Sequence, residues 1–300
     1  MLIDVESPLS LAPRLHEIPP LSPHRLTMPS LFLRRFSLSA TAALALAGSL
    51  FAQTISVVSS TSDFEPRQRT TTGSFDPGPS ITATALRTGF QSDFSFDAAY
   101  FFQLPVLEAG QSIMSADFSV SELPDTAATA LVPNFNADLV ALGFTNTNPP
   151  LNTATESQAY FYLGEGAQDT AAGRQLIQDN FLVPADFIPL GGTSAVKSTT
   201  ANADTVLSGY INGLYTNQGT NGFVPGTSFL ILRLNPDIVG NGASGAPINR
   251  YRLASAENAD ATATKPTLTL VTVPEPASGA VLLVGAVGLA LRRRRRSRRS

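Results

Sequence analysis

The stretch Ser112–Val120, SIMSADFSV, alternates its side chains with a period of two. One face carries Ile113, Ser115, Asp117 and Ser119, and the other carries Met114, Ala116, Phe118 and Val120. Such alternation is typical of a β-strand whose two faces meet different surroundings. The stretch therefore predicts a strand that covers part of a core.

Other short apolar runs also have the composition of strands. They are separated by Pro, Gly and Asn, which are common in turns. Together they predict about eight strands: Ile55–Ser59, Tyr100–Leu104, Ile113–Ser121, Asp138–Phe144, Ala159–Leu163, Thr227–Leu234, Asn249–Ser255 and Thr267–Val273. A chain with many short strands and no visible repeat indicates a mainly-β fold.

One segment, Asn202–Asn217, has helical periodicity instead. Its apolar face holds Val206, Leu207, Tyr210, Ile211, Leu214 and Tyr215. Asn202 or Asp204 is the expected N-cap, and Gly209 and Gly213 each cost about 1 kcal/mol of helix stability. Eight strands and one short crossover helix predict an antiparallel jelly-roll β-sandwich.

Charge divides the 300-residue chain into three parts. The segment Gln53–Pro276 holds nine basic and 20 acidic residues, a net charge of −11, whereas the last 24 residues hold seven arginines and no acid. An acidic body repels phosphate backbones, so we expect no nucleic-acid partner. There is no Cys and no Trp, and the two histidines, His16 and His24, precede this body. These absences exclude Ser-His-Asp and Cys-His catalysis, thiolate- or His-bound zinc, and disulfides from the body.

A secretory signal peptide is predicted over residues 28–52. Arg34 and Arg35 precede an Ala- and Leu-rich stretch, and Ala52 offers a small residue before a cut at Gln53. Ala47 is a second candidate cleavage site, and a buried core helix is the alternative interpretation. Residues 1–27 are Pro-rich and are interpreted as an upstream extension from a mis-assigned start.

The C-terminal end combines a Pro-Glu-Pro motif, an uncharged stretch and basic residues. The motif is Pro274, Glu275 and Pro276, and the basic cluster is Arg292, Arg293, Arg294, Arg295, Arg296, Arg298 and Arg299. The stretch Ala277–Leu291 predicts a transmembrane helix about 22 Å long, shorter than the ~30 Å hydrocarbon core. The arginines are expected to stay on the cytoplasmic side, with the body outside.

The order Val273-Pro274-Glu275-Pro276-Ala277-Ser278, apolar helix, terminal Arg cluster resembles the PEP-CTERM sorting signal of Gram-negative bacteria. The resemblance implies export through the Sec translocon and then processing by exosortase, a membrane-embedded transpeptidase-like protease. It also implies delivery to the cell surface or exopolysaccharide layer after transient residence in the inner membrane. A permanent single-span anchor is the alternative.

The body resembles DNRLRE-type jelly rolls over about Ile81–Val273. The matching residues are Phe102, Leu104, Pro105, Ile113, Ala116, Ser255, Glu257, Pro266, Leu268 and Leu270. That family is similar to carbohydrate-binding modules, and some members bind acidic or uronic glycans. The resemblance implies no binding-site residues for this chain.

Paired carboxylates are the catalytic option that remains in the body. Paired carboxylates of a glycoside hydrolase or lyase are an alternative, although 20 acids also form pairs by chance on a solvated surface. No cofactor is predicted; Asp and Asn oxygens leave a structural Ca²⁺ ion open, although no D-x-D-x-D-G loop is present. Tyr160, Tyr162 and Tyr215 are candidates for stacking on a glycan, with core packing as their alternative role.

These observations predict an exported, non-enzymatic protein of the cell surface or extracellular matrix, associated with exopolysaccharide or, alternatively, purely structural in a biofilm. The expected organisation is an extension (1–27), a signal peptide (28–52), a flexible neck (53–80), a β-sandwich (81–273) and a sorting signal (274–300).

Overall fold

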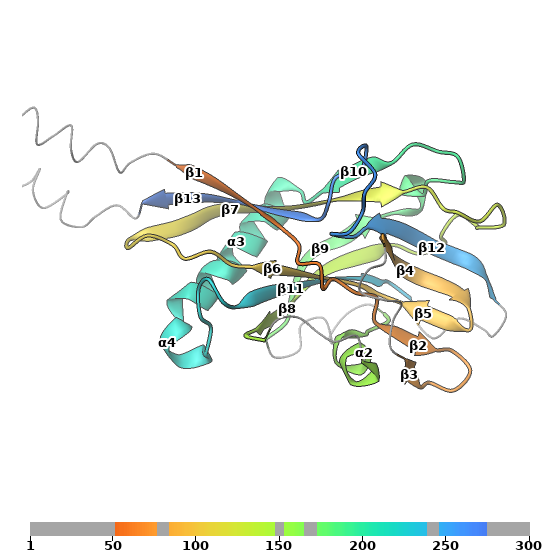
Figure 1. Ribbon diagram of the computed structural model, residues 1–300, viewed down its shortest axis with the longest axis horizontal. Coiled ribbons are helices and arrows are strands. Elements are labelled where there is room, and N and C mark those ends of the chain that lie inside the picture. The colour runs from red at the N-terminus through yellow and green to blue at the C-terminus, as the bar shows by residue number, and fades with distance from the viewer. Residues whose placement is uncertain (1–51, 77–83, 148–152, 165–172, 239–245, 275–300) are drawn as a thin grey trace, which may run out of the picture. The chain divides into compact units, whose positions relative to one another are not determined.

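The computed structural model describes residues 52–76, 84–147, 153–164, 173–238 and 246–274. These residues form two curled antiparallel sheets in a sandwich-like arrangement (Figure 1). The prediction of a mainly-β antiparallel fold is therefore confirmed. The predicted signal helix and the predicted C-terminal transmembrane helix lie outside the described residues.

The larger sheet has nine strands in the order β1-β13-β7-β12-β4-β5-β2-β3, with β10 paired to β7. Their bounds are β1 Gln53–Val58, β2 Arg67–Arg69, β3 Phe75–Asp76, β4 Ala85–Ser92, β5 Phe94–Phe96, β7 Gln111–Leu123, β10 Ala195–Ser198, β12 Ala246–Ala254 and β13 Thr267–Pro274. The first long strand, β1, pairs with the last, β13, with Gln53 opposite Thr272.

The smaller sheet has four strands in the order β6-β11-β8-β9. Their bounds are β6 Ala98–Gln103, β8 Ala137–Thr145, β9 Gln175–Leu182 and β11 Phe229–Pro236. The central strand β11 reads FLILRLNP and is buried over almost its whole length, which explains its continuous apolar run.

Phe118 of β7 lies at the centre of the core between the sheets. Its ring contacts Tyr100 and Phe102 of β6 with centroid distances of 5.6 and 5.9 Å, and Phe181 of β9 at 5.5 Å. Aromatic side chains bury large apolar areas and favour such tilted contacts. The stretch Ser112–Val120, through Phe118, thus packs the two sheets against each other.

The alternation of β7 is interrupted once. The strand register passes from Val271–Ser115 to Thr272–Ile113 and leaves Met114 without a partner on β13, which is a β-bulge. Because the bulge turns the strand by one residue, Ile113 faces the core together with Ala116, while Met114 is 58% exposed. The prediction that Ile113 and Met114 lie on opposite faces is correct. The prediction that Met114 shares the face of Phe118 is wrong, because Ile113 takes that place in the core.

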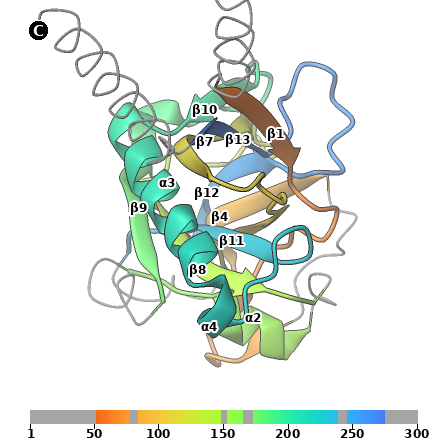
Figure 2. The ribbon, with the colours of Figure 1, turned by 90° about the vertical axis from the view of Figure 1, so that its left-hand side faces the viewer.

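Helix α3, Ala201–Thr216, confirms the predicted helix and packs on β7 of one sheet and β9 of the other (Figure 2). Leu207 and Ile211 are fully buried in the core. Neither predicted residue is the N-cap: the cap is Thr200, whose hydroxyl accepts a hydrogen bond from the backbone N–H of Ala203. A cap must precede the first turn, and Asn202 already lies within it.

The predicted strand Ala159–Leu163 is wrong, and the single-helix prediction is incomplete. Residues Ala154–Tyr160 form helix α2, which begins with a capping box between Thr153 and Glu156. The backbone N–H of Glu156 donates to Thr153 Oγ1 at 3.2 Å, and the N–H of Thr153 donates to Glu156 Oε2 at 2.9 Å. Two shorter helical segments complete the described set: η1 Pro184–Asp186 and α4 Gln218–Asn221.

The prediction of a flexible neck is wrong for residues 53–76, and residues 77–80 lie outside the described chain. This segment supplies β1, β2 and β3, and Phe64 and Glu65 between them are buried. Its many Ser and Thr residues suit exposed strand positions as well as they suit a linker, which explains the error.

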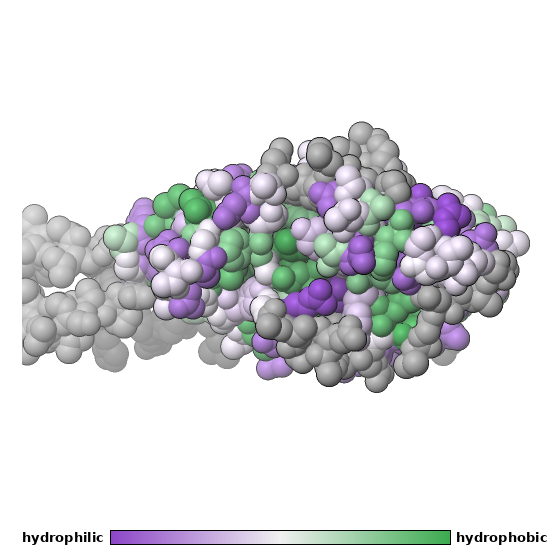
Figure 3. Space-filling view, turned by 90° about the horizontal axis from the view of Figure 1, so that it is seen from below, coloured by the Kyte–Doolittle hydropathy of each residue, from purple (hydrophilic) through white to green (hydrophobic). Residues whose placement is uncertain are grey.

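A second, smaller apolar cluster lies on the outer side of the four-stranded sheet. It joins Phe64, Ala99, Phe101 and Ile231, with Tyr160 of α2 packed against it. The view from below shows hydrophobic side chains gathered between polar ones (Figure 3). The cluster explains why α2 and the chain around Phe64 are held against this sheet.

Candidate functional site

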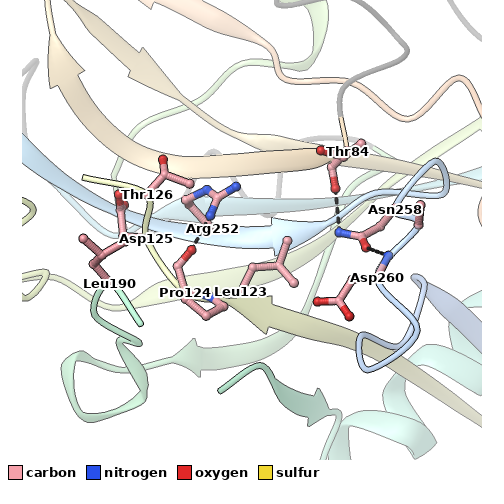
Figure 4. A pocket seen from close by; sticks show the side chains of 10 residues that line it. Thr84, Leu123, Pro124, Asp125, Thr126, Leu190, Arg252, Asn258 and Asp260 are labelled. Carbon is pink, nitrogen blue, oxygen red and sulfur yellow. Dashed lines mark hydrogen bonds between the residues drawn. The ribbon is translucent and has the colours of Figure 1, made fainter. Parts of the chain in front are cut away.

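A pocket of about 420 Å³ opens where the end of β7 meets β12 and the loop that follows β12. Its lining is Thr84, Leu123, Pro124, Asp125, Thr126, Leu190, Arg252, Asn258, Ala259 and Asp260. Figure 4 shows Arg252 and Pro124 toward one end, Asn258 and Asp260 toward the other, and Leu123 between them. The pocket thus combines one cation, two carboxylates, amide and hydroxyl groups, and apolar walls.

Arg252 lies on β12 directly opposite Arg87 of β4. Its Nη1 donates a hydrogen bond to the carbonyl oxygen of Pro124, and this bond points the guanidinium toward the pocket. Burial lowers the pKa of Arg252, but an arginine still carries its charge at neutral pH.

Arg87 is held by a buried carboxylate. Its Nε and Nη2 donate to the two carboxylate oxygens of Glu65 at 2.7 and 2.6 Å, and Glu65 is fully buried. Burial raises the pKa of Glu65 although Arg87 opposes the shift, and the bidentate geometry is that of an ionised carboxylate.

Arg250, two residues before Arg252, has a similar partner. Its Nε and Nη2 donate to Asp125 at 2.9 and 3.0 Å, and both side chains are almost completely buried. Gln91 links the two ion pairs, because its Oε1 accepts hydrogen bonds from Arg87 Nη1 and from Arg250 Nη1. Arg87 and Arg250 therefore belong to one hydrogen-bonded network, and Arg252 lies beside it on β12.

The charges in this region do not balance. Arg87 and Arg250 each have a carboxylate partner, whereas Arg252 has none within salt-bridge distance among the described residues. Like charges opposite each other in a sheet repel. The guanidinium of Arg252 thus lacks an ion-pair partner of its own and could receive an anionic group from outside, although Asp260 adds a negative charge at the other end of the same pocket.

Further basic residues extend this side of the sheet. Arg67 and Arg69 of β2 place their guanidinium carbons 4.7 and 4.6 Å from the ring centre of Phe94 on β5. Arg67 Nε is buried without a hydrogen-bond partner, and Arg69 pairs with Asp76 at 2.7 Å. Five of the nine basic residues of the acidic body lie on β2, β4 and β12.

The two carboxylates of the pocket are poor proton donors. Burial by itself raises the pKa of Asp125, but hydrogen bonds from Arg250 and from the N–H of Ala127 outweigh it and hold this pKa below its usual range. Hydrogen bonds from the Thr262 hydroxyl and N–H lower the pKa of Asp260. A glycosidase needs a carboxylic acid whose pKa is raised, and this pocket does not offer one.

A second pocket, of about 620 Å³, lies between the β6–β7 loop and the end of α3. It contains Tyr215, whose hydroxyl donates to the carbonyl of Pro105 at 2.5 Å and whose ring packs edge-on against Phe223. Asn212, Gln111 and Glu108 supply further polar groups.

The three predicted stacking tyrosines do not come together. Tyr160 packs against Phe64 and Phe101 in the outer cluster. Tyr162 lies under the buried Arg233, whose guanidinium carbon is 5.3 Å from its ring centre. Tyr215 lines the second pocket, so glycan stacking stays a prediction for Tyr215.

The predicted processing residues lie at one corner of the larger sheet. Ala52 is exposed, Gln53 begins β1, and Pro274 ends β13 opposite Gln111. Glu275, Pro276 and the arginine cluster lie outside the described residues. None of the helices in the described segments has the length and continuous hydrophobicity that a bilayer crossing requires.

No group of three or more His, Cys, Asp or Glu side chains suited to a metal ion occurs in the described part of the chain. Asp63 and Glu257 form a close carboxyl pair. Asp63 is buried, its Oδ2 accepts from the N–H of Ala256 at 2.8 Å, and burial together with Glu257 raises its pKa to about 8. The carboxyl of Asp63 thus keeps its proton at neutral pH.

Comparison with known protein families and with curated proteins finds no match to this chain. The functional assignment therefore depends on the site itself. Sequence patterns did not indicate Arg87, Arg250 or Arg252 as site residues, because five arginines among short strands look like solvated surface until the strand order brings them together.

Proposed function

We propose that the protein is an exported, non-catalytic surface or matrix protein that binds an acidic polysaccharide in the pocket beside Arg252. The observation that carries the proposal is the charge imbalance: three neighbouring guanidinium groups, two carboxylate partners, and the unpaired group at the pocket.

The shape and chemistry of the pocket support a sugar acid. A uronate carboxylate can accept two parallel hydrogen bonds from a guanidinium, the pairing for which arginine is best suited. Thr84, Thr126 and Asn258 line the same pocket and suit sugar hydroxyls, while Leu123 and Leu190 provide apolar contact. The absence of Trp from the chain is consistent with recognition by charge rather than by a large stacking platform.

Binding without catalysis is supported by the state of the two pocket carboxylates. Asp125 is occupied by Arg250, and the pKa of Asp260 is lowered. The alternative of a carboxylate glycoside hydrolase or lyase finds no raised-pKa acid in this pocket.

The localisation part of the proposal is supported by the sequence of the two ends. A signal peptide cut at Ala52 and Gln53 delivers the chain to the Sec translocon, and Pro274, Glu275 and Pro276 present it to exosortase. The C-terminal helix and its arginines keep the protein in the inner membrane transiently. The protein is then released to the surface or matrix of a Gram-negative-type bacterium. We propose a jelly roll of the DNRLRE type as the finer fold, on the strength of the resemblance and of the sandwich-like sheets.

The test is binding of the exported protein to a polyuronate, a sulfated polysaccharide and a neutral glucan of matched length. We expect retention on the polyuronate, little on the glucan, and at least about a tenfold loss of affinity in Arg252→Gln, since a hydrogen bond to a charged group contributes about 1.5–3 kcal/mol. Arg174→Gln is the matched control, because it removes the same charge outside the pocket, and its affinity should remain within about twofold.

An equal loss of polyuronate affinity in the two variants would mean that binding depends on overall charge and does not involve the pocket. Absence of binding to every glycan would leave the second candidate, a purely structural surface or biofilm protein. That candidate is favoured by a separate observation, the unprotected edge of the larger sheet.

A further inference from the structure

Sheet edges expose unpaired N–H and C=O groups, and proteins usually protect them with short strands, charges, prolines, bulges or covering segments. Most edges of the described sheets have such protection. β3 has two residues and ends on Asp76, and β10 has four residues and carries Lys197. β9 carries Asp179, and Asn180 next to it has a φ of 56° beside an irregular register.

Two longer edges are covered by the chain itself. On β6, the N–H and C=O of Ala99 bond to Phe64, and the C=O of Phe101 accepts from the N–H of Ser60. On β7, Asn212 of α3 bonds to both backbone groups of Ile113 at 2.9 and 2.7 Å. Thr199 covers Phe118 in the same way.

The edge strand β1 has none of these devices. Its six residues, QTISVV, contain no charge, no Pro and no Gly, and it pairs with β13 without a bulge. Gln53, Thr54, Ser56 and Val58 are exposed, Val58 to 50%. Within the described chain the backbone of β1 has no partner other than β13, so its outer edge is open.

The neighbouring strand continues the same character. β13, TLTLVTVP, also lacks charged residues, so β1 and β13 form an uncharged two-stranded ribbon at the edge of a body with a net charge of −11. Two copies that meet along this ribbon bring no like charges together there. A short, uncharged, β-branched segment without proline is also the composition that favours strand-to-strand association.

We propose that β1 is a self-association surface on which a second copy of this chain adds its own β1 in antiparallel orientation. Two identical strands related by a two-fold axis satisfy each other's outward N–H and C=O groups, so the surface is complementary to itself. Because the strand is short, we expect a weak, concentration-dependent dimer with a Kd between about 1 μM and 1 mM.

The experiment measures association of the exported protein by sedimentation velocity across this concentration range, together with hydrogen exchange of the amides of residues 53–58. Wild type should dimerise, and alternate amides of β1 should become protected at high concentration only. Ser56→Lys should raise the Kd at least about tenfold, because each copy brings a lysine into the same ribbon and like charges there repel. Met114→Lys is the matched control: it places the same charge on an exposed position of β7, inside the sheet, and should dimerise as wild type does.

Thr54→Lys, at another exposed position of β1, replaces Ser56→Lys if the latter unfolds at a lower temperature than wild type. A wild-type protein that stays monomeric up to about 1 mM overturns the proposal. So does a dimer that Met114→Lys weakens as much as Ser56→Lys does, or one without protection in β1. The proposal is independent of the glycan site, because Arg252→Gln should leave the dimer unchanged and Ser56→Lys should leave polyuronate affinity unchanged.

Discussion

Arg87 and Arg252 lie directly opposite each other on β4 and β12, and only Arg87 has a carboxylate partner. The two guanidinium groups lie on the same side of the sheet but differ in their ion-pair partners. Arg87 neutralises the buried Glu65, whereas Arg252 has no carboxylate within salt-bridge distance among the described residues and is only influenced by the charge of Asp125. The same substitution at these two positions should therefore have effects of very different size on stability.

Arg252→Gln should change the free energy of unfolding of the unliganded protein by less than about 0.5 kcal/mol, because it removes the repulsion from Arg87 and Arg250 together with the attraction to Asp125. Arg87→Gln should lower it by about 3–5 kcal/mol, because it leaves the carboxylate of Glu65 buried without its partner. Urea unfolding at neutral pH and low salt measures both values. A marked destabilisation by Arg252→Gln would mean that its bond to Pro124 outweighs the repulsion, and would contradict the charge imbalance.

Asp125→Asn should destabilise the protein by about 3–5 kcal/mol, since Arg250 is 5% exposed and would be left buried without a counter-ion. Asp260→Asn, at the other end of the same pocket, removes a charge that is exposed and should change stability far less than Asp125→Asn does. Thermal unfolding of the two variants side by side checks the contrast. Equal effects would show that the ion pair at Arg250 is not a structural element of the site.

Stability should fall as the pH rises from about 4 to about 8. The pKa of Asp63 is raised from 3.8 in the unfolded chain to about 8 in the fold, so between these values the folded state keeps a proton that the unfolded state has lost. The stabilisation is complete below pH 4 and is lost as the pH approaches 8. Burial raises the pKa of Glu122 to about 8 as well, so two carboxyls contribute in the same direction.

The pH series is best measured as the free energy of unfolding in urea at intervals between pH 4.5 and 8.5 for wild type, Asp63→Asn and Glu122→Gln. An amide resembles the protonated carboxyl, so each variant should show a shallower decline, and the double variant the shallowest. A decline that is as steep in the double variant as in wild type would place its origin in other groups.

Gly89→Ala should destabilise the protein by about 2 kcal/mol or more. Gly89 on β4 has a φ of 126°, and an added Cβ would lie 2.5 Å from the carbonyl oxygen of Asn249 and 2.6 Å from the ring of Phe135. Gly143 has a similar φ of 117° but open space around its Cα, so Gly143→Ala measures the backbone strain alone. Similar losses in both variants would mean that close packing at Gly89 adds nothing.

Part of the fold could be predicted from local patterns. Strands with dense apolar residues, such as β11, and the amphipathic α3 were found because burial on one side leaves a period in the sequence. β4 was not found, since its outward face carries Arg87, Gly89 and Gln91 and its inward face includes Thr88. α2 was also missed, although Thr153 and Glu156 have the spacing of a capping box.

The candidate site was out of reach of sequence patterns for a different reason. Glu65, Arg87, Asp125 and Arg250 come from distant parts of the chain and meet only through the strand order of the larger sheet. Charged residues of this kind are ordinarily exposed, so no local sequence pattern predicts that Glu65 is fully buried. Tyr160, Tyr162 and Tyr215 were predicted as stacking residues only because they are aromatic, and the fold places them apart.

The pairing of Gln53 with Thr272 has a consequence for the order of folding. A ribosome makes a chain from its N-terminal end, so β1 is available first and β13 last. The ribbon they form is therefore the last part of the larger sheet to close, and pairing between such distant segments is slow. Early closure of the larger sheet is hindered by the topology itself, because the closing strand β13 is made only after the other strands of the sheet.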